Sequence, residues 1–311
     1  MSSTAVSAGA STRAVRVLCG PTAAGKSALA MRLAQAVDAA IVSADSRQVY
    51  HGFDVGTAKP TPDEQRRVPH FGIDLVDPHR RYSASDWAAA APSWLTAARE
   101  RQREPLVVGG TGFYLRALFA PLFDAPPLDP DRRAALETWL STRPTVELQR
   151  WCRILDPARA ALGRTQLLRA IETAVLTGHR ISELHATRGR APVLTARYLV
   201  VDPGRALGGA IVERTDAMLA AGWVEEVRTL AATVAPGAPA WTATGYDVLR
   251  RVISGELDLA AAREQVIVAT RQYAKRQRTW FRHQLPAGTP RLDPGAPDAF
   301  DRLLAWWQGG E

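Results

Sequence analysis

A glycine-rich segment near the start of the sequence has the spacing of a phosphate-binding loop. Residues 20–27 read Gly-Pro-Thr-Ala-Ala-Gly-Lys-Ser and follow a short apolar run. In such loops the backbone N–H groups and the next helix N-terminus hold phosphate oxygens, the lysine adds positive charge, and the serine hydroxyl can reach Mg²⁺. We predict that eight residues bind a phosphate ester, which the loop alone does not identify: Gly20, Pro21, Thr22, Ala23, Ala24, Gly25, Lys26 and Ser27.

Two further polar segments follow apolar runs and could supply catalytic groups. Asp45 comes directly after the run 39–44, where its carboxylate would meet the reactive end of a ligand on the phosphate loop. Asp45 there can act as a general base or can cap the next turn, and the spacing leaves both roles open. Residues 109–112 read Gly-Gly-Thr-Gly. This segment either approaches a ligand, to which Thr111 would offer its hydroxyl, or only turns the chain.

Positive charges gather on one face of the helix expected over residues 261–284. At about 100° per residue, four of them fall within about 60° of one another: Arg271, Lys275, Arg278 and Arg282. On the opposite side lie the residues expected to pack: Val266, Ala269, Tyr273 and Trp280. No acid interrupts the four cations along the helix, which favours contact with phosphates over a merely solvated basic face.

The charge balance points to a polyanionic ligand. Arginine and lysine outnumber aspartate and glutamate by 39 to 31, and the net charge is +8. Lysine occurs only at Lys26, Lys59 and Lys275, and arginine takes every other basic position. Because the two side chains are not interchangeable at a phosphate or in a tight contact, we expect these three lysines to make specific contacts.

The elements that must position these residues alternate between strand and helix. Apolar runs predict five buried strands: 14–19, 39–44, 73–76, 105–108 and 198–202. Helical patterns lie between or after them, notably over 28–37, 84–101 and 210–230. This alternation predicts an α/β fold with a parallel sheet flanked by helices, in which ligands bind at the carboxyl ends of the strands. The phosphate loop, Asp45 and Thr111 all follow such an end.

The pattern changes near residue 119. Prolines at 121, 126, 127 and 130 predict a linker, and helices are expected over 129–141 and 165–176. The alternation resumes near Tyr198. We therefore expect a flexible tail over 1–13, an α/β core from 14–118 and 197–311, and a helical insertion over 119–196.

Composition excludes several classes of protein. The chain has 311 residues, of which 46% are hydrophobic and 23% charged, so it is neither wholly disordered nor collagen-like. Two cysteines, Cys19 and Cys152, are too few for a disulfide framework or a cysteine-based zinc site. No apolar run approaches the ~20 residues that cross a bilayer, and residues 1–12 lack the order of a secretory signal. We expect a cytoplasmic protein without membrane contact.

Taken together, these segments resemble the tRNA dimethylallyltransferase family, the tRNA isopentenyltransferases, in its bacterial type without a zinc-finger extension. The resemblance spans nearly the whole chain and rests on blocks in the family's order: 20–27, 45–50 with 56–60, 82–86, 109–112, and 270–277 with 279–282. It implies a core similar to that of phosphate-loop kinases and an insertion that helps to grip tRNA. It also implies a channel in which dimethylallyl diphosphate meets a flipped-out base.

The resemblance further implies the reaction and the roles of residues. A dimethylallyl group would pass to the N6 amine of the adenosine at tRNA position 37, beside the anticodon, with release of diphosphate. The phosphate loop would hold the diphosphate with Mg²⁺ liganded by Ser27, Asp45 would accept the amine proton, and Arg214 would clamp the diphosphate. Thr111 would lie near the reaction centre. Contacts with tRNA are implied for Asp45, Ser46, Arg47, Gln48, Thr111, Arg169, Arg271, Lys275, Arg278 and Arg282.

Two departures from the family pattern concern the grip on tRNA and the diphosphate site. Residues 162–166 read Leu-Gly-Arg-Thr-Gln where the family usually has a polar Asn-Asp turn, and Ala210 replaces a frequent arginine. The expected enzyme is a monomer. Three other functions remain open: a phosphate-loop small-molecule kinase, a prenyltransferase of free adenine nucleotides, and a non-enzymatic nucleotide- or RNA-binding protein.

Overall fold

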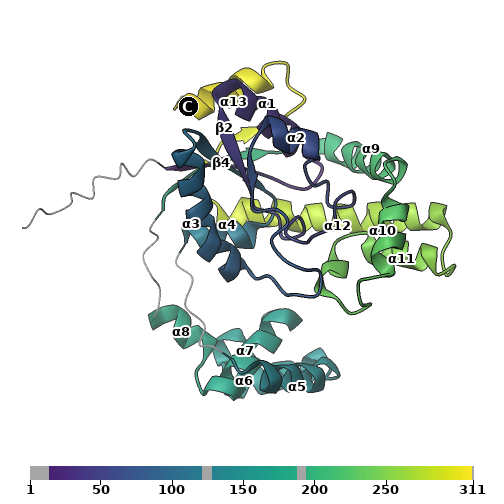
Figure 1. Ribbon diagram of the computed structural model, residues 1–311. Helices are drawn as coiled ribbons and strands as arrows, with labels where there is room; N and C mark the ends of the chain where they lie inside the picture. The colour runs from purple at the N-terminus through teal and green to yellow at the C-terminus, as the bar shows by residue number, and fades with distance from the viewer. Residues whose placement is uncertain (1–13, 121–127, 188–193, 310–311) are drawn as a thin grey trace, which may run out of the picture. The chain divides into compact units, whose positions relative to one another are not determined.

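The computed structural model describes residues 14–120, 128–187 and 194–309 (Figure 1). The tail expected over residues 1–13 and the prolines at 121, 126 and 127 lie outside the described residues. The chain divides into two compact units. One unit comprises Met1–Phe119 with Val193–Glu311, and the other comprises Ala120–Pro192.

The first unit is built on a parallel sheet. In its described part six strands are ordered β3-β2-β4-β1-β5-β6, and every pair is parallel. Their bounds are β1 Val15–Cys19, β2 Ala39–Ser43, β3 His70–Phe71, β4 Glu104–Gly109, β5 Ala196–Val201 and β6 Arg291–Leu292. The central strands β1 and β2 are buried along their whole length, as expected for strands covered on both faces. The predicted α/β class is confirmed.

Helices cover both faces of this sheet. The described helices of the first unit are α1 Lys26–Val37, α2 Pro62–Arg67, α3 Ala84–Glu100, α4 Gly112–Phe119, α9 Leu207–Ala220, α10 Trp223–Ala231, α11 Tyr246–Ile253, α12 Leu259–Gln284 and α13 Ala299–Gln308. Short 3₁₀ helices span Gly204–Ala206 and Pro239–Thr242. Figure 1 shows α1 and α13 together on one side of the sheet and α3 and α4 on the other, and each pair packs in its own core cluster.

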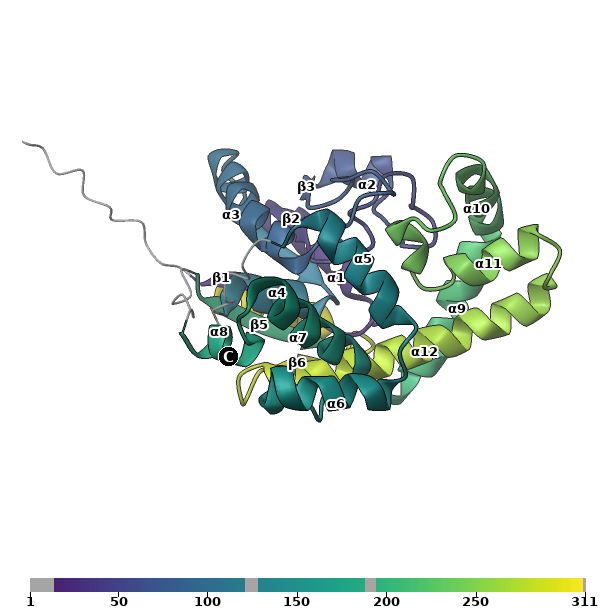
Figure 2. The same ribbon diagram turned by 90° about the horizontal axis from the view of Figure 1, so that it is seen from below.

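Helix α12 contributes to both core clusters. Its Val266 and Phe281 belong to the core cluster that includes α3 and α4, whereas Ile267 and Ala274 belong to the cluster that includes α1 and α13. Figure 2 shows α12 running along the first unit, with α9, α10 and α11 gathered around one of its ends. A long helix in this position can contact the loops that follow several strands, and these loops carry the predicted site.

The third strand lies at a different place from the one predicted. We expected it over residues 73–76, but β3 is His70–Phe71, and the predicted segment forms only a single bridge, between Tyr50 and Val76. Gly72 and Asp74 have φ angles of 79° and 49°, so the chain turns immediately after Phe71. The apolar residues after this turn pack against the segment around Tyr50 instead of extending the strand.

One block of the sequence explains where a helix starts. In the block 82–86, Ser83 and Asp86 form a capping box at α3: the Ser83 hydroxyl accepts from Asp86 N at 3.1 Å, and Asp86 accepts from Ser83 N at 2.8 Å. The cap fixes the helix that presents Trp87, whose indole N–H donates to Ser43 O at 2.9 Å. This contact holds the end of β2, directly before Asp45.

The second unit is helical. It contains α5 Pro130–Ser141, α6 Thr145–Leu155, a 3₁₀ turn Pro157–Arg159, α7 Arg164–Thr177 and α8 Ile181–Thr187. Asp129 caps α5 by accepting from two backbone N–H groups at 2.9–3.0 Å, and buried Leu148, Cys152 and Leu167 contribute to its core. None of the described helices in either unit is long and apolar enough to cross a membrane.

Candidate active site

The predicted phosphate loop lies between β1 and α1 and needs its glycines. Gly20 has a φ of 148°, and a Cβ there would lie 2.1 Å from Val201 O on the neighbouring strand. Gly25, with a φ of 77°, starts α1, and no side chain caps that helix. The N–H groups of the first turn are therefore available to an anion, which the positive end of the helix also favours.

Two cations face the same cavity at this loop. Lys26 donates from Nζ to Pro21 O at 2.6 Å. Burial and the positive charge of Arg214 lower the pKa of Lys26 to about 8, against the opposing effects of Asp45 and Cys19. Burial also lowers the pKa of Arg214, which forms no hydrogen bond or ion pair with the residues that the structure describes. Among the described residues neither side chain forms an ion pair, so this end of the cavity suits a multiply charged anion.

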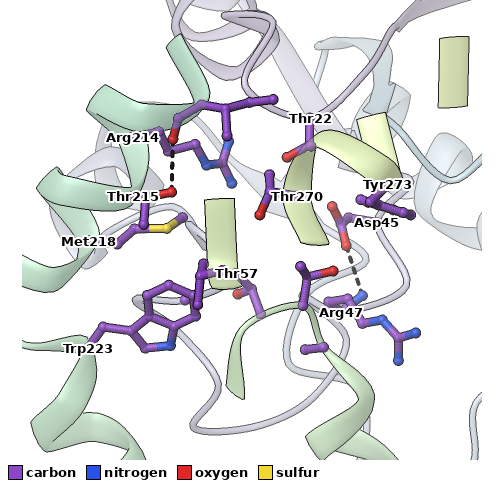
Figure 3. A pocket seen from close by; sticks show the side chains of 15 residues that line it. Thr22, Asp45, Arg47, Thr57, Arg214, Thr215, Met218, Trp223, Thr270 and Tyr273 are labelled. Atoms are coloured by element: carbon purple, nitrogen blue, oxygen red, sulfur yellow. Dashed lines mark hydrogen bonds between the residues drawn. The ribbon is translucent and has the colours of Figure 1, made fainter. Parts of the chain in front are cut away.

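Two adjoining cavities meet at the predicted base. The larger, about 690 Å³, is lined by the phosphate loop residues Thr22, Lys26 and Ser27. The smaller is drawn in Figure 3 and is lined by Arg47, Trp223 and Thr270 among others. Six residues line both cavities: Thr22, Asp45, Thr57, Arg214, Met218 and Tyr273. Figure 3 shows Arg214 reaching in from α9 and Asp45 from the opposite side.

The geometry of Asp45 fits both roles that the sequence left open. Its Oδ1 accepts from Arg47 N at 2.8 Å, which is the turn-capping bond of an Asx turn. Oδ2 forms no hydrogen bond with the described residues, and the side chain lines both cavities. One carboxylate oxygen thus fixes the turn while the other stays available to a substrate.

Thr111 lies behind this turn. Its hydroxyl oxygen accepts from Ser46 N at 3.0 Å, and its own N–H donates to Ala44 O at 3.2 Å. Thr111 lines neither of the two cavities. Its geometry is that of a group that holds the Asp45–Ser46 turn in place.

Gln48 and Arg47 fix the wall of the cavities that follows the turn. The Gln48 amide accepts from the Ser43 hydroxyl at 2.8 Å and donates to Ala58 O at 2.9 Å. Arg47 donates to the Thr242 hydroxyl at 2.7 Å. Both side chains are half-buried and line a cavity, so they have contacts within the protein as well as a surface open to a ligand.

Lys59 has the specific contact expected from the scarcity of lysine. Its buried ammonium donates to Tyr50 O at 2.8 Å, to Asp74 Oδ1 at 2.6 Å and to the Asp54 carboxylate. All three donor positions of the ammonium are used within the protein. Lys59 therefore fixes the loop 54–59, whose Thr57 lines both cavities.

Sequence reasoning missed the group that holds the other side of this loop. Glu226 in α10 accepts from Asp54 N at 3.0 Å, Val55 N at 2.6 Å and the Tyr246 hydroxyl at 2.6 Å. The partners lie about 170 residues before it and 20 residues after it. No local sequence signal connects such distant positions.

Tyr273 was expected on the packing face of its helix and proves to line both cavities. Burial, and then the negative charge of Asp45, raise the pKa of Tyr273 to about 12. Its hydroxyl is therefore a neutral hydrogen-bonding group beside the predicted base. The helical period placed the residue on the buried face but could not show that this face borders a cavity.

The four cations of α12 do not have the same surroundings. Arg271, Lys275 and Arg282 are exposed. Arg278 instead pairs with Asp202 at the end of β5 and donates to Gly204 O at 2.5 Å. Asp202, which follows β5, lies 76 residues before Arg278 in the sequence, so the sequence of α12 alone does not show this acid among its cations. Arg169 is exposed on α7, in the second unit.

Ser27 suits a magnesium ion bound to a phosphate ester. It lies in the first turn of α1 and lines the larger cavity together with Asp45. Mg²⁺ is usually bound through one or two protein groups together with substrate phosphates and water. A serine hydroxyl and a carboxylate that line one cavity match that donor set, and the described residues contain no separate cluster of three or more His, Cys, Asp or Glu suited to a metal.

Comparison with known proteins assigns the chain to a family. The IPP transferase model matches residues 48–284, and the isopentenyl transferase model matches residues 13–71. A tRNA dimethylallyltransferase of Deinococcus radiodurans is 42% identical over 298 residues, covering 93% of this chain and 95% of the relative. One of Bordetella petrii is 43% identical over 278 residues, covering 86% and 88%.

A solved structure agrees with these matches in sequence. The full-length tRNA isopentenylpyrophosphate transferase of Bacillus halodurans has a TM-score of 0.66 and 30% identity, covering 95% of this chain and 96% of that one. The resemblance seen in the sequence blocks is thereby confirmed. The chain belongs to the IPP transferase family, the family of the proteins named tRNA dimethylallyltransferase.

Proposed function

We propose that this enzyme transfers a dimethylallyl group from dimethylallyl diphosphate to N6 of the adenosine at tRNA position 37 and releases diphosphate. The names of its relatives support the class of reaction. The observation that carries the proposal is the position of Asp45, which lines both the cavity of the phosphate loop and the adjoining cavity. A base at this junction can take a proton from an acceptor whose amine meets the reactive end of the diphosphate ester.

The diphosphate binds to the phosphate loop in this account. The free N–H groups at the start of α1 accept its oxygens, and Lys26 and Arg214 neutralise its charge. Neither side chain forms an ion pair with the residues that the structure describes, although the charge of Asp45 acts on both, so the diphosphate becomes their main counter-ion. Because an allylic C–O bond breaks readily once the leaving charge is neutralised, these groups contribute most of the rate enhancement.

The transfer forms one C–N bond and breaks one C–O bond. The N6 lone pair forms a bond to the allylic carbon while the C–O bond to diphosphate breaks and its electron pair leaves with the diphosphate oxygen. The amine proton passes to the free Oδ2 of Asp45. The Arg47 N–H keeps Oδ1 occupied, so the carboxylate is held in one orientation toward the acceptor.

Ser27 and the adjacent diphosphate would hold Mg²⁺. When bound, the ion supplies further charge neutralisation to the leaving diphosphate. The residues of this chain that orient the substrate remain the same: the loop N–H groups, Lys26 and Arg214.

The tRNA contacts fall into two groups. Asp45 and Arg47 line the smaller cavity and would contact the flipped-out base, and Gln48 lines the larger one. Ser46 and Thr111 line neither cavity, so they would serve the tRNA by holding the Asp45 turn. The exposed Arg271, Lys275 and Arg282, together with Arg169 of the second unit, would bind phosphates around it. We assign Arg278 a weaker contribution, since Asp202 already compensates its charge. We further propose that the enzyme acts as a monomer in the cytoplasm.

The test is a choice of acceptor. The wild-type protein is incubated with Mg²⁺ in three tubes. Two contain dimethylallyl diphosphate with unmodified tRNA or with AMP, and the third contains ATP with a small-molecule acceptor. We expect a single dimethylallyl group on the tRNA, located at adenosine 37 by nucleoside and fragment mass analysis. Transfer to AMP but not to tRNA would favour the free-nucleotide enzyme, and ATP consumption without prenyl transfer would favour a kinase.

A further inference from the structure

One buried side chain joins the two loops that the proposed reaction uses. Gln277 of α12 accepts at Oε1 from Thr22 N at 2.7 Å and donates from Nε2 to Gly110 O at 2.8 Å. Thr22 follows β1, and Gly110 follows β4, the neighbouring strand. A single amide therefore bridges the phosphate loop and the segment that carries Thr111.

The bridge is tightly enclosed. Gln277 is 7% exposed. A Cβ at Gly110 would lie 2.4 Å from Gln277 Nε2 and 3.2 Å from Gly20 O, so a side chain at position 110 would displace the amide. Only one orientation of the amide satisfies both partners, because its oxygen accepts from an N–H group and its nitrogen donates to a carbonyl.

The bridge continues to the proposed base. Gly110 precedes Thr111, whose N–H donates to Ala44 O and whose hydroxyl accepts from Ser46 N. These two bonds hold the turn in which Asp45 lies. On the other side, Thr22 lines both cavities and belongs to the loop that binds the diphosphate. The geometry thus connects the place of the leaving group with the place of the proton acceptor through one side chain.

We propose that Gln277 is a positioning residue: it sets the phosphate loop and the Asp45 turn at the separation that the transfer requires. This inference rests on the proposed function. A displacement of about 1 Å between reacting groups costs about 10²-fold in rate. Loss of the amide leaves a buried N–H and a buried carbonyl to find new partners, and these movements would displace the two loops separately.

The main test variant is Gln277→Met, which keeps the length of the side chain and removes both hydrogen bonds without adding charge. The matched control is Gln265→Met on the same helix, whose exposed amide accepts from Arg251 at 3.2 Å outside both cavities. Single-turnover rates are measured at saturating tRNA and dimethylallyl diphosphate, together with tRNA affinity and thermal unfolding. We expect Gln277→Met to lower the rate about 10²-fold with unchanged tRNA affinity, and Gln265→Met to match wild type.

A merely structural role would give a different pattern. It would lower the unfolding temperature but leave the single-turnover rate of the folded protein at the wild-type value, which would overturn the inference. Equal rate losses in Gln277→Met and Gln265→Met would overturn it as well. Gln277→Asn is the second variant if Gln277→Met does not fold, because its shorter amide can satisfy one partner but cannot span both, and the same rate loss is expected.

Failure of the proposed function is recognised separately. If the wild-type protein transfers no prenyl group to tRNA, that function fails. Binding of dimethylallyl diphosphate without tRNA then tests the bridge alone: Gln277→Met should bind it more weakly than wild type and Gln265→Met, because Thr22 is no longer held. Equal binding by all three proteins would contradict the inference.

Discussion

Lys26 and Arg214 line one cavity from two different helices, and the positive charge of Arg214 helps to lower the pKa of Lys26. The two residues are 188 positions apart in the sequence, in α1 and α9. Neither the phosphate loop alone nor the helix that carries Arg214 indicates the pairing. Together they form an anion site that stays under electrostatic strain until a ligand supplies negative charge.

This relationship predicts a pH dependence of diphosphate binding. The pKa of Lys26 is about 8 in the empty site, so Lys26 is charged at pH 7 and loses its proton as the pH rises through 8. The bound anion requires the charged form, and affinity for inorganic diphosphate should fall between pH 7.5 and pH 9.5, by about tenfold per pH unit at most well above that pKa.

Titration calorimetry across this range checks the prediction, with Lys26→Arg as the comparison. Arginine remains charged at these pH values, so the variant reports the ionisation of the ligand itself. The wild-type affinity should fall relative to the variant as the pH rises. Parallel curves would show that Lys26 does not titrate in the free site.

Glu226 predicts a stability effect remote from the chemistry. In Glu226→Ala the backbone N–H groups of Asp54 and Val55 and the Tyr246 hydroxyl lose their common acceptor, so we expect a loss of about 2–3 kcal/mol in the free energy of unfolding. Chemical denaturation measures this change. The neighbouring Glu225→Ala removes only an exposed pair with Arg228 and should change stability by less than about 1 kcal/mol. Equal losses in the two variants would argue against the anchoring role of Glu226.

The cations of α12 should divide into two kinds when they are tested one by one. Arg271→Ala and Lys275→Ala should each weaken tRNA binding and reduce the slope of log affinity against log salt by about 1. Arg278→Ala should reduce this slope less and should also lower stability, because it removes the closer of the two ion pairs of Asp202 and leaves only Arg291 at 3.8 Å. Diphosphate binding should stay unchanged in Arg271→Ala and Lys275→Ala.

Filter binding of tRNA at several salt concentrations provides the slopes. Arg302→Ala on α13 serves as a control for a simple change in net charge. A slope that falls equally in Arg302→Ala and Arg271→Ala would show that the effect comes from overall charge and not from a phosphate contact.

The sequence predicts those parts of the site that depend on short spacing. The phosphate loop, helix α12 and the strand before Asp45 all follow from patterns of residues that are close together in the sequence. Strand β3 was misplaced because apolar content alone did not reveal the turn at Gly72 and Asp74. The sequence has no strong signal for a positive φ angle at an aspartate, so the turn that ends this strand could not be predicted.

The remaining site residues could not be predicted because their partners are distant in the sequence. Gln277 meets Thr22 across 255 positions, and Glu226 meets Asp54 across 172. The helical period places Arg278 among the solvent-facing cations of α12, but in the folded chain it pairs with Asp202, which follows β5. Periodicity shows which face of a helix is buried, whereas only the folded chain shows which strand end or loop that face meets.

The central claim is that Asp45 accepts the amine proton at the junction of the two cavities. Asp45→Asn tests it most directly, because the Asn oxygen can still accept from Arg47 N while the side chain can no longer take a proton; Asp301→Asn, exposed on α13, is the matched control. The measurement is the single-turnover rate of dimethylallyl transfer to adenosine 37, followed by nucleoside mass analysis at saturating substrates. The account predicts a loss of about 10²- to 10⁴-fold in Asp45→Asn, with diphosphate binding retained and Asp301→Asn equal to wild type. A wild-type rate in Asp45→Asn would contradict it.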